Sequence, residues 1–409
     1  MKNLYSILTI VIVFSAASPH DTLQATPLKE ISVRYHFNLA TWEPSHLPLK
    51  WIYKIGVNLF PLSEQINDRA TFIADFLAHQ KKVANLDALM NEAAIRKDTK
   101  LEFIEETFAK SNQEVRKIQM KSEEAFESMI SDTLRSEKIP KIMVGPLFFP
   151  PVDFVFEPLP TILVTSPRNK IERLESVFLK PNLPPSTREM LETMILDQEE
   201  LSAIVENIGG LSTFPNMIAT YDLRTTIDIA GHEWLHSHLF FQPLGRSIHK
   251  DSNMNIINET TANIFGEELS NLIYAQLTGE NPQKSVVGQG ETNECPKELF
   301  CFNEEMRKTR LMADALLEKG QIEETEAYLE KQRQKFVDNG YAIRKLNQAF
   351  FAFHGTYSDS PTSISPINNQ LMQLRKASSS LSDFIRKVEG IYNHEQFLKL
   401  LEENGISSP

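Results

Sequence analysis

The residues best suited to chemistry in this chain are His232, Glu233 and His236, in the string Gly231-His232-Glu233-Trp234-Leu235-His236. Residues four apart lie on the same face of a helix, so both imidazoles can bind one metal ion. Glu233 lies one step around the helix, where its carboxylate can reach a water molecule on that ion. Zinc lowers the pKa of its bound water toward about 7, and a neighbouring glutamate can take the proton as the water attacks a carbonyl. The spacing therefore matches the requirements of metal-assisted hydrolysis.

This short pattern also occurs by chance, and the simplest alternative is a solvated helix that happens to carry two histidines. The flanking residues argue against it, because several of them are apolar: Ile227, Ile229, Ala230, Leu235, Leu239 and Phe240. A helix flanked in this way is substantially buried, where unpaired polar groups are costly. A second polar string, Asn258-Glu259-Thr260-Thr261-Ala262-Asn263, begins 22 residues after His236 and starts another predicted helix.

Together the two strings resemble those of the gluzincin metallopeptidases, whose third zinc ligand is a glutamate on a helix downstream of the HExxH motif. The resemblance implies that Glu259 is the third ligand, beside His232 and His236, and that Glu233 is the general base. Asn263, one turn after Glu259, matches the residue that supports a ligand histidine in that family. The implied cofactor is Zn²⁺ and the implied partner is a peptide or protein substrate.

Two other readings of the second string stay open. Glu259 could instead be a carboxylate that interacts favourably with the dipole at the start of its helix. Glu267 and Glu268 are rival ligands, two further turns along the same predicted helix.

A wider resemblance is to an uncharacterised family of bacterial exported or membrane-anchored HExxH proteins. The strings that carry it are Pro150 to Arg168, Gly209-Gly210, His232 to Gly245, Asn258 to Glu267, and Arg344 to Tyr357. They cover most of the chain after its first residues, but the resemblance implies no particular substrate.

Hydrolysis of this kind also needs a donor that stabilises the developing oxyanion. Tyr357 and His354, in a glycine-containing break after an apolar helix, are candidates by position, and a structural role fits each of them as well. His238 is expected on the opposite side of the helix from the ligands, and His249 in the loop between the two motif helices. The predicted strand at 214–220 is placed to pair with an extended peptide.

The overall composition limits the classes of partner. The chain has 409 residues and a net charge of −12. Phosphate binding requires clustered Lys and Arg, and here these residues are interspersed with Glu and Asp, so nucleic acid is excluded as a partner. With 23% charged and 41% hydrophobic residues, the composition is that of an ordinary folded protein.

Residues 1–25 are predicted to be a targeting segment. Lys2 precedes an apolar run from Leu4 to Ala17, and 14 residues are few against the roughly 20 that span a bilayer. Either a cleaved signal peptide or an uncleaved N-terminal membrane anchor fits, and both place the body outside the cytoplasm, periplasmic or extracellular. Cys295 and Cys301, the only cysteines, could form a small disulfide loop there or stay free.

The predicted fold class is α+β and mostly helical: a zincin-like metallopeptidase domain at 141–409, with a small β-sheet, follows a helical N-terminal region at 26–140. The stretch 63–139 contains neither Gly nor Pro and predicts at least two long helices. The expected strands are Phe154–Phe156, Thr161–Thr165 and a pair within 203–220, and the residues 167–201 are expected to be helical. Further helices are expected at 222–241, 255–277, 304–337 (a hairpin turning at Lys319-Gly320) and 343–353, and around Leu371 and Phe384.

Two other functions compete with that of a soluble-type peptidase. An intramembrane zinc protease needs its motif in a long apolar span, and Asp222, Arg224 and Asp228 before the motif exclude that. A non-catalytic exported zinc-binding or protein-interaction module on the same scaffold stays open, although it would not need Glu233. The sequence decides neither exo- versus endopeptidase action nor the oligomeric state.

Overall fold

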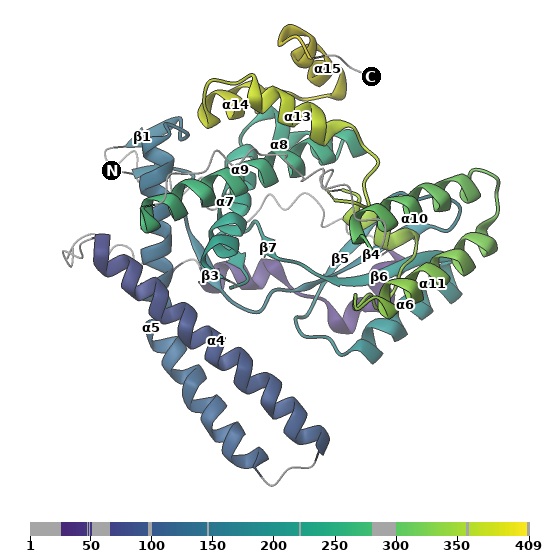
Figure 1. Cartoon of the computed structure of the whole chain (residues 1–409), viewed down its shortest axis with the longest axis horizontal. Coiled ribbons are helices and arrows are strands. Elements are labelled where there is room, and N and C mark those ends of the chain that lie inside the picture. Colours follow the sequence, from purple (N-terminus) through teal and green to yellow (C-terminus); the bar gives the residue numbers. More distant parts are fainter. Residues whose placement is uncertain are drawn as a thin grey trace.

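The structure is a computed structural model of the whole chain (Figure 1). It describes residues 26–46, 48, 50, 66–96, 100–144, 147–220, 222–279, 300–356 and 360–406. The predicted leader at 1–25, Cys295 and Tyr357 lie outside the described residues. Cys301 is disulfide-bonded.

The chain has a mixed α+β fold that is mostly helical, as predicted. The helices are α2 (Pro27–Ser32), α4 (Ile66–Arg96), α5 (Leu101–Ser136), α6 (Pro185–Glu199), α7 (Leu223–Leu239), α8 (Pro243–Arg246), α9 (Ser252–Thr278), α10 (Phe302–Leu317), α11 (Ile322–Asp338), α12 (Gln348–His354), α13 (Ile367–Lys376), α14 (Leu381–Val388) and α15 (His394–Glu403). None of the helices within the described ranges is both long and apolar enough to span a membrane.

The two long N-terminal helices form a hairpin whose far end projects from the body (Figure 1). They contain 31 and 36 residues, as expected from a stretch without Gly or Pro. Near the body, Phe76 and Phe126 are fully buried and belong to the same apolar core as the residues around α7 and α9. At the far end Phe103 is 71% exposed. The hairpin is therefore held at its base by the main hydrophobic core.

Two three-stranded sheets and one two-stranded ribbon make up the β-structure of the described residues. The long sheet has the order β5 (Ser176–Leu179), β4 (Thr161–Pro167), β6 (Leu201–Asn207), and all its pairs are antiparallel. The short sheet has the order β3 (Phe154–Phe156), β8 (Asn216–Ile218), β7 (Gly210–Leu211), with β3 and β8 parallel. The ribbon consists of β1 (Ile142–Val144) and β2 (Leu147–Phe149).

Two expectations about this region are wrong. The stretch 167–201 is not all helical, because β5 pairs with β4 before α6 begins at Pro185. The segment 214–220 is not an edge strand: its β8 lies between β3 and β7 in the short sheet. The turn after Gly210–Leu211 brings the chain straight back, so the shorter β7 occupies the edge instead.

The helices α7 and α9 pack closely at two glycines. A Cβ atom on Gly231 of α7 would lie 3.2 Å from the Cα of Gly266 on α9, and a Cβ on Gly266 would lie 2.5 Å from the backbone oxygen of Asp228. Larger side chains at these positions would separate the two helices. The close approach sets the distance across which residues of α7 and α9 can share a ligand.

An N-terminal segment, residues 26–46, 48 and 50, runs along both sheets. The α2 helix packs on α6, and His36 then pairs with Leu179 at the β5 edge of the long sheet. Farther along, Trp42 packs against the short sheet, and its indole Nε1–H donates to Glu157 at 3.0 Å. The segment thus links the two sheets.

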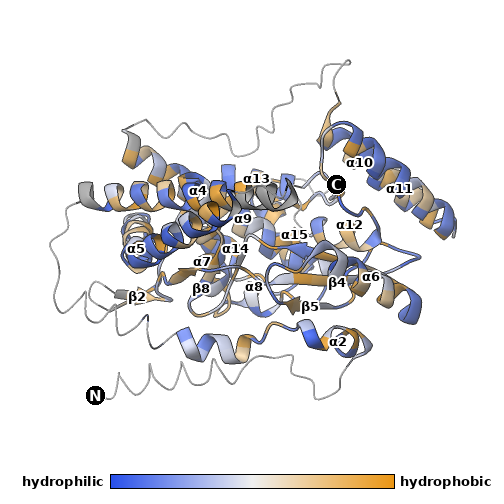
Figure 2. Ribbon diagram, turned by 90° about the horizontal axis from the view of Figure 1, so that it is seen from below, coloured by the Kyte–Doolittle hydropathy of each residue, from blue (hydrophilic) through white to orange (hydrophobic). Residues whose placement is uncertain are grey.

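The C-terminal half follows the predicted helices closely. Gly320, in a left-handed conformation with φ +73°, separates α10 from α11, whose hairpin is mostly hydrophilic on the outside (Figure 2). The helix expected at 343–353 begins later, because the side chain of Asn347 caps its N-terminus. α15 was not predicted, although Asn393 caps it in the same manner.

Candidate metal centre

The two histidines of the motif lie on α7, which starts where the sequence predicts. The carboxylate of Asp222 accepts hydrogen bonds from the backbone N–H groups of Arg224 and Thr225 at 3.0 and 3.2 Å, and so caps the helix. His232 and His236, one turn apart, both face α9. That helix is capped by Asp251 and presents Glu259 two turns after its start.

The three predicted ligands meet at one point. The Nε2 atoms of His232 and His236 are 3.0 Å apart, and the Oε2 atom of Glu259 lies 3.5 Å from each of them. Tetrahedral zinc with bonds of 2.0–2.2 Å requires ligand atoms about 3.3 Å apart. The triangle therefore has the dimensions of one face of a zinc tetrahedron, and two imidazoles with one carboxylate form a donor set that zinc commonly takes. Among the described residues these three are the only such group.

Burial and mutual charge act on the ligands. Their side chains are 13%, 15% and 16% exposed. Burial alone would raise the pKa of Glu259, but the charges and hydrogen bonds of His236 and His232 outweigh it and hold that pKa well below its usual range. Burial lowers the pKa of His236, and the Glu259 carboxylate more than reverses this, raising it to about 9. The carboxylate is thus ready to bind a cation.

Glu233 lies beside the triangle and against the edge strand β7. Its side chain is 7% exposed, and burial raises the pKa of its carboxyl group, with a further contribution from Glu259. A Cβ atom on Gly210 would lie 2.4 Å from Glu233 Oε1. A side chain at position 210 would displace this carboxylate, so the absence of one leaves the space that Glu233 occupies between β7 and α7.

A small polar network fixes β7 and its loop on α7. Ser212 Oγ donates to the backbone oxygen of Glu233 at 3.2 Å and lies 3.1 Å from Ser237 Oγ. Ser237 Oγ is also 3.2 Å from Asn216 Oδ1, which in turn accepts the backbone N–H of Thr213 at 3.1 Å. The sequence alone does not identify these residues, since their role depends on contacts between a strand and a helix.

Asn258 is better placed than Asn263 to support a ligand histidine. Its side chain is 1% exposed, and its polar contact with His236 contributes to the raised pKa of that imidazole. The buried Oδ1 atom makes no hydrogen bond of ordinary geometry to another described residue. Asn263 lies one turn after Glu259 and is partly exposed. Its predicted supporting role stays a prediction.

The rival ligands and the extra histidines have other positions. The carboxylate of Glu268 is bound by Arg375 through two hydrogen bonds of 2.7 and 2.8 Å, and Glu267 is exposed. His238 is buried, with Nε2 3.1 Å from Glu389 Oε2. His249 is exposed in the loop before α9, as expected.

His354 lies outside the ligand group. It is the last residue of α12, which packs on β4 and β6 of the long sheet. The centre of its ring lies 4.3 Å from that of Phe350 and 5.0 Å from that of Phe353. Burial lowers the pKa of its imidazole to about 4. Its predicted part in stabilising an oxyanion, like that of Tyr357, stays a prediction.

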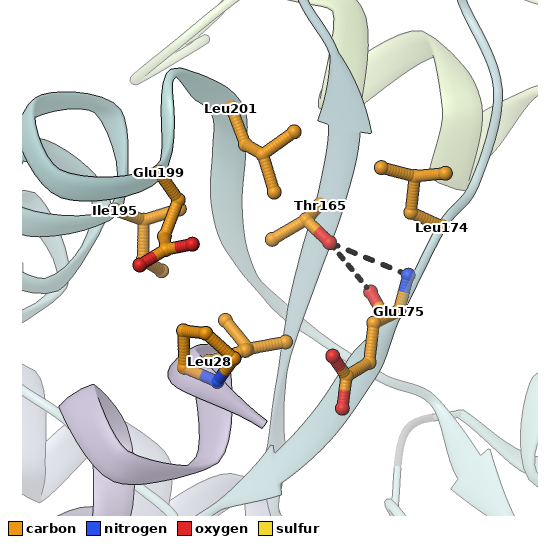
Figure 3. A pocket seen from close by; sticks show the side chains of 8 residues that line it. Leu28, Thr165, Leu174, Glu175, Ile195, Glu199 and Leu201 are labelled. Atoms are coloured by element: carbon orange, nitrogen blue, oxygen red, sulfur yellow. Dashed lines mark hydrogen bonds between the residues drawn. The ribbon is translucent and has the colours of Figure 1, made fainter.

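A cavity of about 110 Å³ lies elsewhere in the fold (Figure 3). It lies between α2, the long sheet and α6, and is lined by Pro27, Leu28, Thr165, Leu174, Glu175, Ile195, Glu199 and Leu201. Thr165 Oγ1 hydrogen-bonds the backbone of Glu175 in its wall. None of the predicted site residues lines this cavity.

No protein-family model matches the chain, and no curated protein or solved structure is similar to it. The likeness to gluzincins therefore depends on the two motifs and on the positions of their residues.

Proposed function

We propose that this protein is a zinc-dependent peptidase whose metal is held by His232, His236 and Glu259. The observation that carries the proposal is the triangle of ligand atoms, 3.0 to 3.5 Å on each side, formed by two helices. A zinc ion bound there would act as a Lewis acid and lower the pKa of a bound water.

Glu233 is the residue that would take the proton from that water. Its carboxyl group lies beside the ligands, and its raised pKa brings it closer to the pH at which a general base works best. The contacts of Ser212 and Ser237 hold the backbone of this residue against the loop of β7. Both residues therefore position the base, and neither needs to touch the substrate.

An extended peptide fits the edge of the short sheet. β7 is the outer strand of that sheet and lies directly against Glu233, so a peptide paired with β7 would place a carbonyl near the base. This arrangement favours a peptide over other substrates that contain a hydrolysable carbonyl.

The first test is elemental analysis for zinc, after purification without chelators, in wild type, Glu259→Gln, Glu233→Gln and Glu267→Gln. We expect about one zinc per chain in wild type and much less in Glu259→Gln, because one of the three protein ligands is removed. Glu267→Gln, with the same change of charge on the same helix, is the matched control and should retain zinc.

Cleavage of a peptide library then separates an enzyme from a zinc-binding module. Glu233→Gln should retain zinc and lose activity by 10²- to 10⁴-fold, the typical contribution of a general base. Zinc bound by wild type with no cleavage of any peptide would favour the non-catalytic module. No zinc in wild type, even after zinc is added back, would refute the metal site.

A further inference from the structure

The exposed sides of α7 and α9 form a continuous polar surface that extends from the metal ligands. On α7, accessible polar side chains recur every four positions, at Arg224, Asp228, His232 and His236. On α9 Glu259, Asn263, Glu267 and Tyr274 are likewise at least partly accessible, whereas the side of each helix that faces the core is buried. We call this surface the helix floor.

Arg224 is the only Lys or Arg in either helix of the helix floor. It is the second residue of α7, where the helix dipole disfavours a positive charge. Asp228 and Glu267, also on the floor, are acidic. A lone cation that the helix dipole disfavours suggests a role beyond stabilising α7.

The guanidinium group of Arg224 is fixed by neutral groups. One Nη2–H donates to the side-chain oxygen of Asn271, and the group lies over the ring of Tyr274, 5.3 Å from its centre. Among the described residues Arg224 forms no salt bridge, although it is exposed. The cation is thus oriented by α9 while its charge stays available.

We propose that Arg224 binds a carboxylate of the substrate and so makes the protein selective for acidic peptides, an inference that depends on the proposed peptidase function. Eight residues of helix separate Arg224 from His232, a distance of about 12 Å. An extended peptide advances roughly 3.3–3.6 Å per residue. The carboxylate therefore belongs to a residue about three or four positions from the bond that is cleaved.

Two sources of carboxylate fit this distance: an Asp or Glu side chain, and the C-terminal carboxylate of a short peptide. An arginine fork binds either of them through two parallel hydrogen bonds. Asn271 and Tyr274 restrict the orientation of the guanidinium group and so reduce the conformational entropy lost on binding.

The test measures binding of fluorescent peptides to zinc-loaded Glu233→Gln protein, with and without the additional change Arg224→Gln. The peptides form matched pairs, Glu against Gln at one internal position, and a free C-terminus against an amide. We expect the acidic member of one pair to bind about 10-fold more tightly, and Arg224→Gln to abolish this preference without weakening the neutral peptides. Which of the two pairs shows the preference identifies the source of the carboxylate.

Two further variants give the test its controls. Arg246→Gln removes the same charge from an exposed position on α8 and should leave the preference intact. Arg224→Lys should restore part of it. Equal losses for acidic and neutral peptides in Arg224→Gln would show a structural role, and no preference in the parent protein would also overturn the inference.

Zinc analysis of the wild type, taken together with the binding data, separates this inference from the proposed function. If the wild type binds no zinc even when zinc is added back, but still shows a preference that depends on Arg224, the peptidase is refuted and the anion site stands. Zinc-dependent cleavage without any such preference would support the peptidase and refute the anion site at Arg224.

Discussion

Lys50 and the pair His232–His236 both lie near carboxylates inside the protein, but the two groups differ in their surroundings. At the base of α5 the Lys50 Nζ atom is 2.5 Å from Glu123 Oε2 and 3.0 Å from Glu127 Oε1, and none of these side chains is more than 4% exposed. On α7 and α9 the ligand side chains are 13–16% exposed, and their nearest atoms converge on one point.

The Lys50 cluster has its cation and its hydrogen-bond donors built in. Glu127 Oε1 accepts the backbone N–H of Phe154, and Glu123 Oε1 accepts that of Phe156, so both carboxylates also complete the free edge of β3. Such a closed cluster stabilises the fold and offers nothing to a ligand. The histidine cluster, by contrast, is organised around a shared point and accessible from solvent. Convergence of the ligand atoms and access from solvent, more than burial, therefore distinguish a binding site from a structural cluster.

The largest effect is expected from breaking the closed cluster. Lys50→Met should destabilise the protein by about 3–5 kcal/mol, because it leaves two buried carboxylates without their cation. Zinc binding by the folded protein should not change. Urea unfolding measures the effect. The control is Lys110→Met, which removes an exposed i,i+4 ion pair from α5, the helix of Glu123 and Glu127, and should cost no more than about 0.5 kcal/mol. Equal losses of unfolding free energy in the two variants would show that the Lys50 cluster stabilises the fold no more than a surface pair does.

The imidazole of His354 is a titratable group whose pKa is shifted by burial alone. Burial lowers this pKa to about 4. Between about pH 6.5 and 4 the unfolded chain binds a proton that the folded protein does not, so stability should fall as the pH falls through this window.

The loss attributable to His354 is at most about 3 kcal/mol. Unfolding free energies measured from pH 7 to 4 should therefore decline less steeply in His354→Gln than in wild type. The exposed His249→Gln serves as the control for removing a histidine. A slope that is unchanged in His354→Gln would contradict the assignment.

Gly210→Ala and Gly209→Ala together test whether β7 holds the Glu233 carboxylate in place. The added methyl group would meet Glu233 Oε1 at 2.4 Å and displace the carboxylate, whereas the methyl group of Gly209→Ala would meet only Ile229 Cδ1 at an ordinary 3.6 Å. Since a displacement of about 1 Å can cost roughly 10²-fold in rate, peptide cleavage should drop by that order in Gly210→Ala alone. Zinc content should be equal in both variants, and equal activity would show that β7 does not constrain the base.

The smallest effect is expected on zinc affinity, when the side chain that contacts the ligand His236 is removed. Asn258→Ala should weaken zinc binding by about 10- to 100-fold, the usual cost of removing a group that orients a ligand histidine. Competition with a chelator of known affinity measures this, with Asn263→Ala beside it. A larger loss of zinc affinity in Asn263→Ala than in Asn258→Ala would show that Asn263 supports the ligand histidine, as the sequence predicts.

The sequence predicts the parts of this fold that depend on local signals. The helices α7 and α9 and the hairpin of α10 and α11 follow from spacing, caps and Gly320. β5 was missed because its pairing with β4 is a contact between distant residues that the charged flanks do not reveal. For the same reason the sequence suggests the segment 214–220 as the strand that pairs with a peptide, whereas β7 lies at the edge. No single segment determines the order of the strands in a sheet.

The candidate site was predictable to a similar degree. The histidines and Glu259 follow from helical spacing and the motif, and the structure places them together. Asn258 was passed over in favour of Asn263, because the four-residue spacing identifies a shared helix face but not which side chain reaches across to α7. The contact between Gly210 and Glu233 likewise depends on how the short sheet packs against α7.

The N-terminal segment has a consequence for the order of folding. Thr26 hydrogen-bonds Glu175, 149 residues later, Trp42 bonds Glu157, 115 residues later, and Lys50 pairs with Glu123, 73 residues later. On a chain made from its N-terminus, Lys50 can pair once α5 has been synthesised, but Thr26 and Trp42 have no such partners until Glu175 and Glu157 have followed. The first part of the described chain to emerge must therefore dock late, after long loops have closed, which makes its docking one of the slower steps of folding.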